Sequence, residues 1–222
     1  APSYLRTHPL TTERIADIEA RIRDMPYRQR LDSLEFSLVK ARARVLQDDT
    51  TQGWRDATVF FTEQLQQGVR AQVMGAHYGL AMIALRQKDV ARAGSLLEAL
   101  HADVARETSL PSSPALLSMD IEYRLVSGQA EQALALATEG RNRFPLSRAL
   151  TMQYAESLLA AGKKEAAAAF LRDQSQLYRQ DAGVQRALAR VYAEQGKQAL
   201  QHLALAEYYF LSGALPSALE QL

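Results

Sequence analysis

The residues of this chain that could do chemistry are its four histidines, and their spacing does not build a catalytic site. They are His8, His77, His101 and His202. A zinc peptidase needs two histidines one helical turn apart with a glutamate beside the first, so that the metal and the carboxylate together activate water. None of the four lies four residues from another. His77 and His202 fall inside helical patterns, where a packed or surface histidine is more common than a metal ligand. His101 falls at a helix end, where a partly protonated imidazole suits the helix dipole.

Other catalytic signatures are also missing from the sequence. It contains no GxSxG nucleophile turn and neither of the glycine-rich phosphate loops, GxxxxGK[ST] and GxGxxG. Asp48 and Asp49 fall in a predicted turn and are typical of a solvated surface. The chain has no cysteine, which excludes a thiol nucleophile, a disulfide and a cysteine-based zinc site. We therefore expect this chain to be no enzyme and to hold no cofactor or metal of its own.

Charge and hydropathy narrow the range of partners. The 26 basic and 25 acidic residues are interleaved and give a net charge of +1. A nucleic-acid-binding domain needs a basic stripe, so we expect no nucleic-acid partner. No run approaches the roughly 18 apolar residues of a membrane span. The densest basic stretch is more typical of a solvated helix end than of a phosphate site; it contains Arg21, Arg23, Arg28 and Arg30.

The elements that position these residues are indicated by a ladder of glycines. Gly128, Gly162 and Gly196 are 34 residues apart, each after a run of small and apolar residues, and Gly213 follows 17 residues later. Thirty-four residues is the period of the tetratricopeptide repeat, a helix–turn–helix unit that stacks into a solenoid. Glycine enters the left-handed conformation that ends many helices without a Cβ penalty. Each glycine therefore predicts the turn between the two helices of one repeat.

Upstream the period is less regular. Lys88 stands where a turn glycine is expected, 40 residues before Gly128, so about six residues are inserted. The insertion is the breaker-rich segment 108–114. A weaker hairpin precedes it, over residues 33–45 and 54–68. We therefore predict an all-α fold, a tetratricopeptide-type solenoid of about five helix hairpins with a half-repeat at the C-terminus, in which a helix over 198–211 closes one repeat and opens the next.

A solenoid of this type has a concave face that holds a segment of a partner protein. Counted from the turn residues, the side chains expected to face this groove are Tyr78, Met82, Glu122, Met152, Glu156, Arg186, Arg190 and Glu194. Arginines can bind carboxylates or carbonyl oxygens. Methionines suit adaptable contacts, but Met82 and Met152 could equally fill gaps between helices.

The N-terminal segment does not fit the repeat. We predict that residues 1–31 form a linker and a helix from about Glu13 to Arg23, capped by Thr11 or Thr12 after the extended Pro9. Residues 32–222 form the repeat domain. Both ends of the sequence suggest that the chain continues in a longer protein.

The N-terminal segment also resembles a known family. Thr7-His8-Pro9, followed by an acidic residue and Arg14-Ile15, is similar to the segment that closes the protease domain of HtpX-like zinc metallopeptidases. In the BepA-type (YfgC-type) periplasmic branch of that class, a tetratricopeptide array follows directly. Further stretches resemble that branch; they are Phe36 with Lys40-Ala41-Arg42, Tyr78-Gly79 with Ala81-Met82, and Leu205–Gly213 with Ala218.

The resemblance implies the non-catalytic part of a periplasmic metalloprotease that assists or clears outer-membrane β-barrel proteins. The HExxH helix and the downstream glutamate of such proteases are not in this sequence. The resemblance implies that the partners are precursors of outer-membrane proteins or their assembly machinery. It also implies that zinc is bound only in the intact parent protein. His8 is then a possible auxiliary zinc ligand in that parent. The alternative, without the resemblance, is a stand-alone cytoplasmic scaffold or adaptor.

Overall fold

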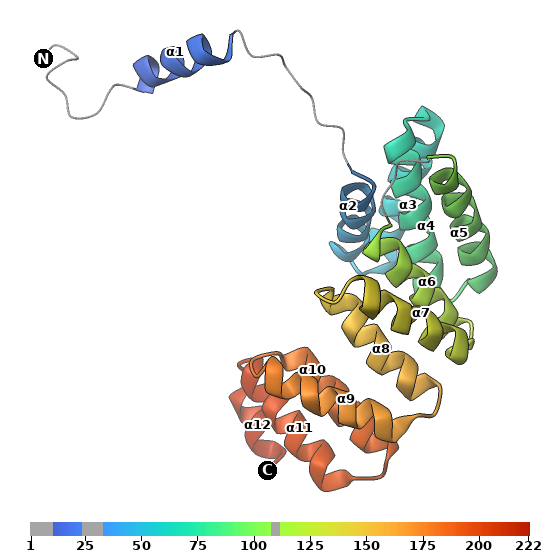
Figure 1. Ribbon diagram of the computed structural model, residues 1–222, viewed down its shortest axis with the longest axis vertical. Coiled ribbons are helices and arrows are strands. Elements are labelled where there is room, and N and C mark those ends of the chain that lie inside the picture. The colour runs from blue at the N-terminus through green and yellow to red at the C-terminus, as the bar shows by residue number, and fades with distance from the viewer. Residues whose placement is uncertain (1–10, 24–32, 108–111) are drawn as a thin grey trace, which may run out of the picture. The chain divides into compact units, whose positions relative to one another are not determined.

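The computed structural model describes residues 11–23, 33–107 and 112–222, and the described residues are all-α (Figure 1). They form twelve helices and no strand. The chain divides into two units, residues 1–32 and residues 33–222. The helices are α1 (Thr11–Ile22), α2 (Leu34–Leu46), α3 (Thr51–Gln67), α4 (Arg70–Arg86), α5 (Val90–Ala105), α6 (Pro114–Val126), α7 (Ala130–Arg143), α8 (Arg148–Ala160), α9 (Lys164–Leu177), α10 (Ala182–Glu194), α11 (Gln198–Leu211) and α12 (Leu215–Glu220).

The first unit contributes one described helix, α1. This helix begins at Thr11, two residues before the predicted start, so Thr11 and Thr12 belong to its first turn instead of preceding it as caps. Arg21 pairs with Asp17 one turn earlier at 2.9 Å. Three isoleucines at helical spacing are about half exposed; they are Ile15, Ile18 and Ile22. Several positions discussed above lie outside the described residues; they are Thr7, His8, Pro9, Arg28, Arg30 and the start of the insertion, 108–111.

In the second unit, each helix packs against its neighbours in sequence, from α2 to α12. The even-numbered helices also contact one another, α2 with α4, α4 with α6, α6 with α8, and α8 with α10. Within the described ranges, no odd-numbered helix contacts another odd-numbered one. The even-numbered helices from α2 to α10 therefore form a continuous layer, and the odd-numbered ones pack outside it, an arrangement consistent with a repeat solenoid of helix pairs.

The same turn joins the two helices of four successive pairs and leads into α12. Gly128, Gly162, Gly196 and Gly213 have φ of +73°, +73°, +69° and +78°, and Lys88 has φ of +61°. At Gly162 the backbone N–H donates to the carbonyl of Leu159 (3.0 Å), and the next N–H donates to that of Leu158 (2.9 Å). The other four turns repeat this pair of bonds, which defines a Schellman motif. The predicted turn positions are confirmed, including Lys88 in place of glycine.

Small residues allow the paired helices to approach closely, as their spacing from the turns predicted. Ala133, Ala137 and Ala167 are each fully buried against the partner helix layer. Helices α3 and α4 approach so closely at Gly79 that only glycine fits there. A Cβ built at this position would lie 2.3 Å from the ring of Phe61 on α3. The helix-to-helix distances in this unit are therefore set by residues without bulk at the contact points.

Helix α4 is the most enclosed element of the unit. It contacts α2, α3, α5 and α6, and every residue from Met74 to Leu85 is buried except His77, which is partly buried. α2 and α6 also contact each other, so together they cover the side of α4 that lies in the even-numbered layer. Tyr78 and Met82 are accordingly core residues with 0% exposure. They do not line an open groove, which corrects the prediction at these two positions.

A polar network ties α2, α4 and α6 together beside this core. Arg42 of α2 donates to the hydroxyl of Tyr78 at 3.3 Å and pairs with Glu122 of α6 at 3.5 Å. The Tyr78 hydroxyl donates to the carbonyl of Ala115 at 3.4 Å, and burial raises the pKa of Tyr78 although Arg42 opposes that rise. Glu122 is half-buried, and its charge is neutralised by the pair with Arg42. It is therefore part of this network and does not face an open groove.

The turn geometry predicts opposite effects on stability at Gly162 and Lys88. Gly162→Ala should lower the free energy of unfolding by about 1 kcal/mol, because nothing crowds a Cβ there and the loss is the cost of a left-handed alanine. Lys88→Gly should raise it by up to about 1 kcal/mol, since relief of the same strain is partly offset by glycine's larger entropy in the unfolded chain. Urea unfolding followed by circular dichroism measures both.

Lys88→Ala is the matched control, because it removes the charge but keeps a Cβ at the same φ. Its stability should stay close to that of the unchanged protein. A gain for Lys88→Ala as large as that for Lys88→Gly would contradict the explanation by backbone strain.

Candidate functional site

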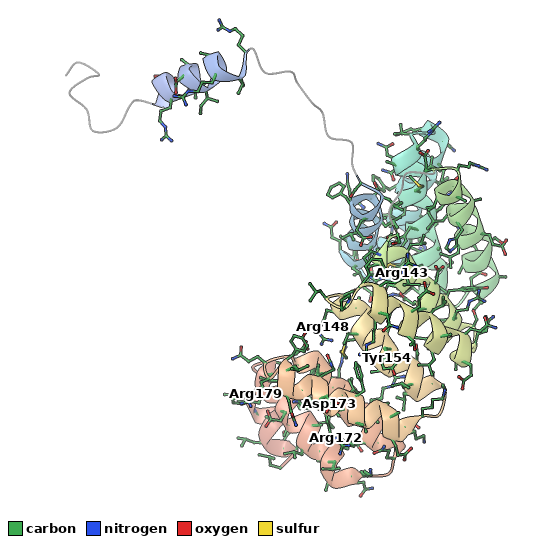
Figure 2. All side chains as sticks on the ribbon, viewed as in Figure 1. Arg143, Arg148, Tyr154, Arg172, Asp173 and Arg179 are labelled. Atoms are coloured by element: carbon green, nitrogen blue, oxygen red, sulfur yellow. The ribbon has the colours of Figure 1, made fainter. Side chains whose placement is uncertain are left out.

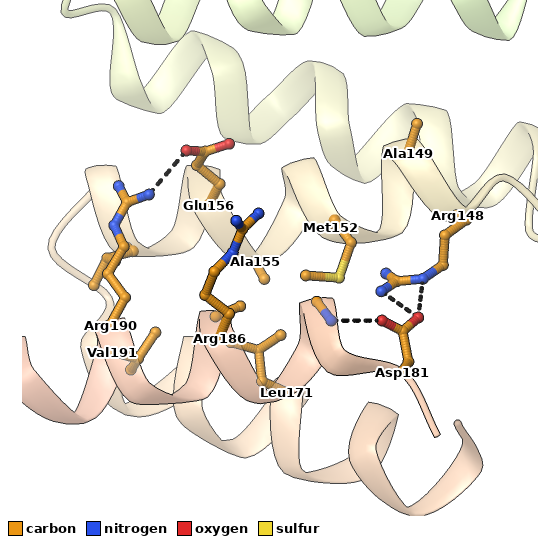
Figure 3. A pocket seen from close by; sticks show the side chains of 13 residues that line it. Arg148, Ala149, Met152, Ala155, Glu156, Leu171, Asp181, Arg186, Arg190 and Val191 are labelled. Carbon is orange, nitrogen blue, oxygen red and sulfur yellow. Dashed lines mark hydrogen bonds and ion pairs between the residues drawn. The ribbon is translucent and has the colours of Figure 1, made fainter. Parts of the chain in front are cut away.

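The candidate site is a cavity of about 600 Å³ between α8 and α10 (Figure 3). Its floor is apolar, formed by Met152, Ala155 and Val191 of the two helices and by Leu171 of α9. Its walls carry charged side chains from both helices, among them Arg148, Glu156 and Arg190. The cavity therefore combines apolar contact area with ionic groups, which is typical of surfaces that bind segments of other proteins.

Four of the eight predicted groove residues meet in this cavity. Met152 and Glu156 come from α8, and Arg186 and Arg190 come from α10, one repeat later. The other four lie elsewhere. Tyr78 and Met82 are core residues and Glu122 pairs with Arg42, as described above. Glu194 contacts Lys164 of α9 at 3.3 Å, away from the cavity.

The repeat explains which positions line the cavity, and the packing explains where they are accessible. Met82, Glu122, Glu156 and Arg190 each stand six residues before their turn residue, so they occupy equivalent places in successive repeats. At α4 this place is covered by α2 and α6. At α8 and α10 no described helix lies over it, and Glu156 and Arg190 have side chains that are 45% and 61% exposed.

Asp181 and Arg148 form one wall of the cavity, and the sequence analysis did not find them. Asp181 is the N-cap of α10, where it accepts from the N–H of Gly183 at 2.9 Å, and the same carboxylate pairs with Arg148 of α8. Arg148 begins α8 (Figure 2). An aspartate before Ala182-Gly183 is a recognisable capping signal. Its partner is 33 residues away and could be identified only from the packing of α8 on α10.

The opposite wall and the centre of the cavity differ in how their charges are paired. Arg190 donates to Glu156 at 3.1 Å. Arg186 is exposed, and its guanidinium lies 5.9 Å from the ring centroid of Tyr208 on α11. Among the residues that the structure describes, Arg186 has no carboxylate partner. Three guanidinium groups thus face two carboxylates, and the surplus positive charge belongs to Arg186.

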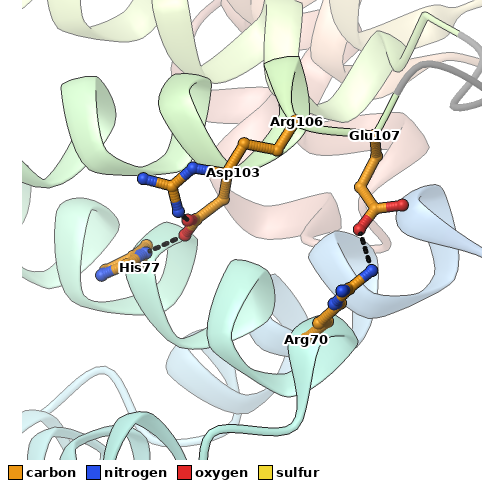
Figure 4. Close-up of polar contacts among 5 residues, drawn as sticks. All are labelled: Arg70, His77, Asp103, Arg106 and Glu107. Carbon is orange, nitrogen blue, oxygen red and sulfur yellow. Dashed lines mark hydrogen bonds and ion pairs between the residues drawn. The ribbon is translucent and has the colours of Figure 1, made fainter.

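A second hollow, of about 350 Å³, lies at the ends of α4 and α5. Its charged groups are all paired (Figure 4). Arg70 contacts Glu107 at 2.8 Å, and Asp103 accepts both from Arg106 and from the ring of His77, each at 2.9 Å. His77 is therefore a packed histidine held by a carboxylate. In residues 11–23, 33–107 and 112–222, no three His, Asp or Glu side chains gather as metal ligands would.

A second histidine–aspartate pair joins α5 to α6. His101 Nε2 lies 2.8 Å from Asp120 Oδ1, and the two side chains are 48% and 21% exposed. The hydrogen bond with Asp120 raises the pKa of His101, against partial burial that opposes the rise. The pair bridges the two helices on either side of the insertion.

No protein-family model matches the chain. None of the described helices is long and apolar enough to cross a membrane. His8, the residue that the family resemblance connects with zinc, lies outside the described residues.

The double role of Asp181 predicts a graded loss of stability. Asp181→Ala removes both the cap and the partner of Arg148, and it should lower the free energy of unfolding by about 1–2 kcal/mol. Asp181→Asn keeps a capping oxygen and loses only the ion pair, so its loss should stay below about 1 kcal/mol. Urea unfolding of the two variants measures the difference; equal losses would show that the cap does not contribute.

The pair of His101 and Asp120 predicts a pH-dependent contribution to stability. The folded pKa of His101 is raised above its unfolded value of about 6.5, so the pair stabilises fully below that value and its contribution is lost as the pH rises through the folded pKa. The unchanged protein should exceed His101→Gln in stability at about pH 5.5, by less than about 1 kcal/mol because the pair is partly exposed. The difference should shrink by about pH 8.5, as thermal unfolding can test.

Asp120→Asn is the control for that experiment. It should show the same loss at acid pH as His101→Gln, because each variant removes one partner of the same pair. A difference between His101→Gln and the unchanged protein that grows with pH would contradict the assignment.

Proposed function

We propose that residues 33–222 are a tetratricopeptide-type solenoid that binds segments of other proteins in the groove between α8 and α10. The observation that carries this proposal is the cavity itself, with an apolar floor and ionic walls on the even-numbered layer of helices. The five equivalent turns and the 34-residue spacing support the repeat assignment. The inner helix layer is where solenoids of this class hold their partners.

We further propose, from the resemblance of the N-terminal segment, that the chain is the non-catalytic part of a BepA-type periplasmic zinc metalloprotease. Its partners are then precursors of outer-membrane β-barrel proteins or their assembly machinery, and its compartment is the periplasm. The mechanism is a raised local concentration of substrate beside a protease domain. Zinc and peptide hydrolysis belong to that domain, and in the intact parent His8 is placed near the metal.

The proposal predicts that an unfolded outer-membrane β-barrel protein contacts the groove directly. The purified chain carries a photoreactive phenylalanine derivative at Ala149, which lines the groove and is exposed. The β-barrel protein, diluted from urea, should form covalent adducts from this position on illumination. Mass spectrometry of the adducts identifies the barrel segments that lie in the groove.

The matched control places the same group at Glu98, which is exposed on α5, a helix that contacts neither α8 nor α10. Adduct yield from Glu98 should remain at the level of random collision. Equal yields from the two positions would contradict binding in the groove. An unfolded cytoplasmic protein of similar length tests the preference for β-barrel substrates in the same assay.

A further inference from the structure

The charge pattern of the groove specifies which partner segment it accepts. We propose that the groove binds a segment whose internal aspartate or glutamate side chain pairs with Arg186, with apolar residues on both sides of that acid. This inference rests on the proposed function, because it names the chemistry of the segment bound at the same groove.

Arg186 is the guanidinium in the groove that no carboxylate of the described residues holds; its contact is with the ring of Tyr208, whose centroid lies 5.9 Å away. Arg148 is held by Asp181, which is itself fixed by capping α10. Arg190 is held by Glu156 at 3.1 Å. Figure 3 shows the guanidinium of Arg186 standing between these two ion pairs with no interaction drawn to it. Pairing of a guanidinium with a carboxylate is charge-assisted, and it is stronger in a partly desolvated groove than in open solvent.

The floor of the groove determines what flanks the acid. The accessible apolar surface beside Arg186 comes from Met152 and Leu159 of α8 and Ala187 of α10, which are partly exposed, above the buried Ala155 and Val191. The lined groove extends past Arg186 in both directions, to Arg148 and Asp181 on one side and to Glu156 and Arg190 on the other, so a segment that fills it continues past Arg186 both ways. The carboxylate therefore comes from an internal side chain instead of the end of a chain. Methionine at the centre of the floor adapts to apolar neighbours of different shape.

The two carboxylates of the groove select against ligands of higher charge. Glu156 and Asp181 lie on the walls on either side of Arg186. They cancel the charges of Arg190 and Arg148, so one positive charge remains for the ligand. A phosphate group or a run of acids would bring its further negative charge close to these carboxylates, where like charges repel. A single carboxylate on the ligand matches the one uncancelled positive charge of the groove, that of Arg186.

The test uses three synthetic libraries of fluorescent 12-residue peptides with apolar positions randomised among Leu, Val, Phe and Tyr. The first has a central Glu and an amidated C-terminus, the second has Gln in place of Glu, and the third has Gln and a free C-terminal carboxylate. Fluorescence anisotropy with the 222-residue chain gives the affinities. The Glu library should bind about tenfold more tightly than the Gln library, a typical effect of one charge-assisted pair.

The variants assign this preference to Arg186. Arg186→Gln should bind the Glu and Gln libraries equally, and Arg186→Lys should keep part of the preference because it keeps the charge. Arg172→Gln, on α9 outside the groove, should behave like the unchanged protein. Circular dichroism checks that each variant is folded. If Arg186→Gln does not fold, the smaller preference of Arg186→Lys for the Glu library still tests the role of Arg186.

The outcomes separate this inference from the proposed function. Equal affinity of the unchanged protein for the Glu and Gln libraries, with photo-crosslinking from Ala149 to the peptides, would overturn the role of Arg186 and leave groove binding intact. Tighter binding of the third library would assign the site to a chain terminus. A peptide with central phosphoserine that binds more tightly than Glu would overturn the selection for a single charge. No binding by any library, with no crosslinking from Ala149, would overturn both proposals.

Discussion

The left-handed turn between paired helices is the constraint on which the rest of the second unit depends. At each of five turns the chain must adopt φ near +70° for one residue, so that two backbone N–H groups reach back to the last carbonyls of the helix. The next helix then begins two residues later and packs against the one before it. Because the turn is the same each time, residues at equal distances from it occupy equivalent places in successive pairs. The composition of the groove follows from this equivalence.

The equivalent positions nevertheless differ in burial from one end of the unit to the other. At α4 they are buried, because α2 and α6 meet over that helix and Arg42 links Tyr78 to Glu122. At α8 and α10 no described helix covers them, and the same repeat positions become the walls of a cavity. One face of the repeat is thus core at one end and lines an open cavity at the other. A lining residue is defined as much by what packs over it as by its place in the repeat.

In the proposed groove, ion pairs would direct recognition without adding much stability. Exposed pairs such as that of Glu156 and Arg190 contribute little to the free energy of folding. They do fix the positions of two guanidiniums and cancel their charge, which leaves Arg186 as the free cation. Asp181 acts in the same way while also capping α10. In the proposed binding mode, specificity comes from the one charge of the groove that has no carboxylate partner among the described residues.

The sequence alone determined the helical fold, the turn positions and four of the residues in the groove. Each depends on local chemistry: the αL preference of glycine, small residues at close contacts, and a 34-residue spacing that keeps positions in register. The N-cap at Asp181 was equally local and could have been found from its neighbours. The tertiary structure decided what distant segments do to one another. The burial of Tyr78 and Met82 under α2 and α6, and the pairing of Arg148 with Asp181, depend on how helices far apart in sequence pack, and no periodicity within one repeat encodes that packing.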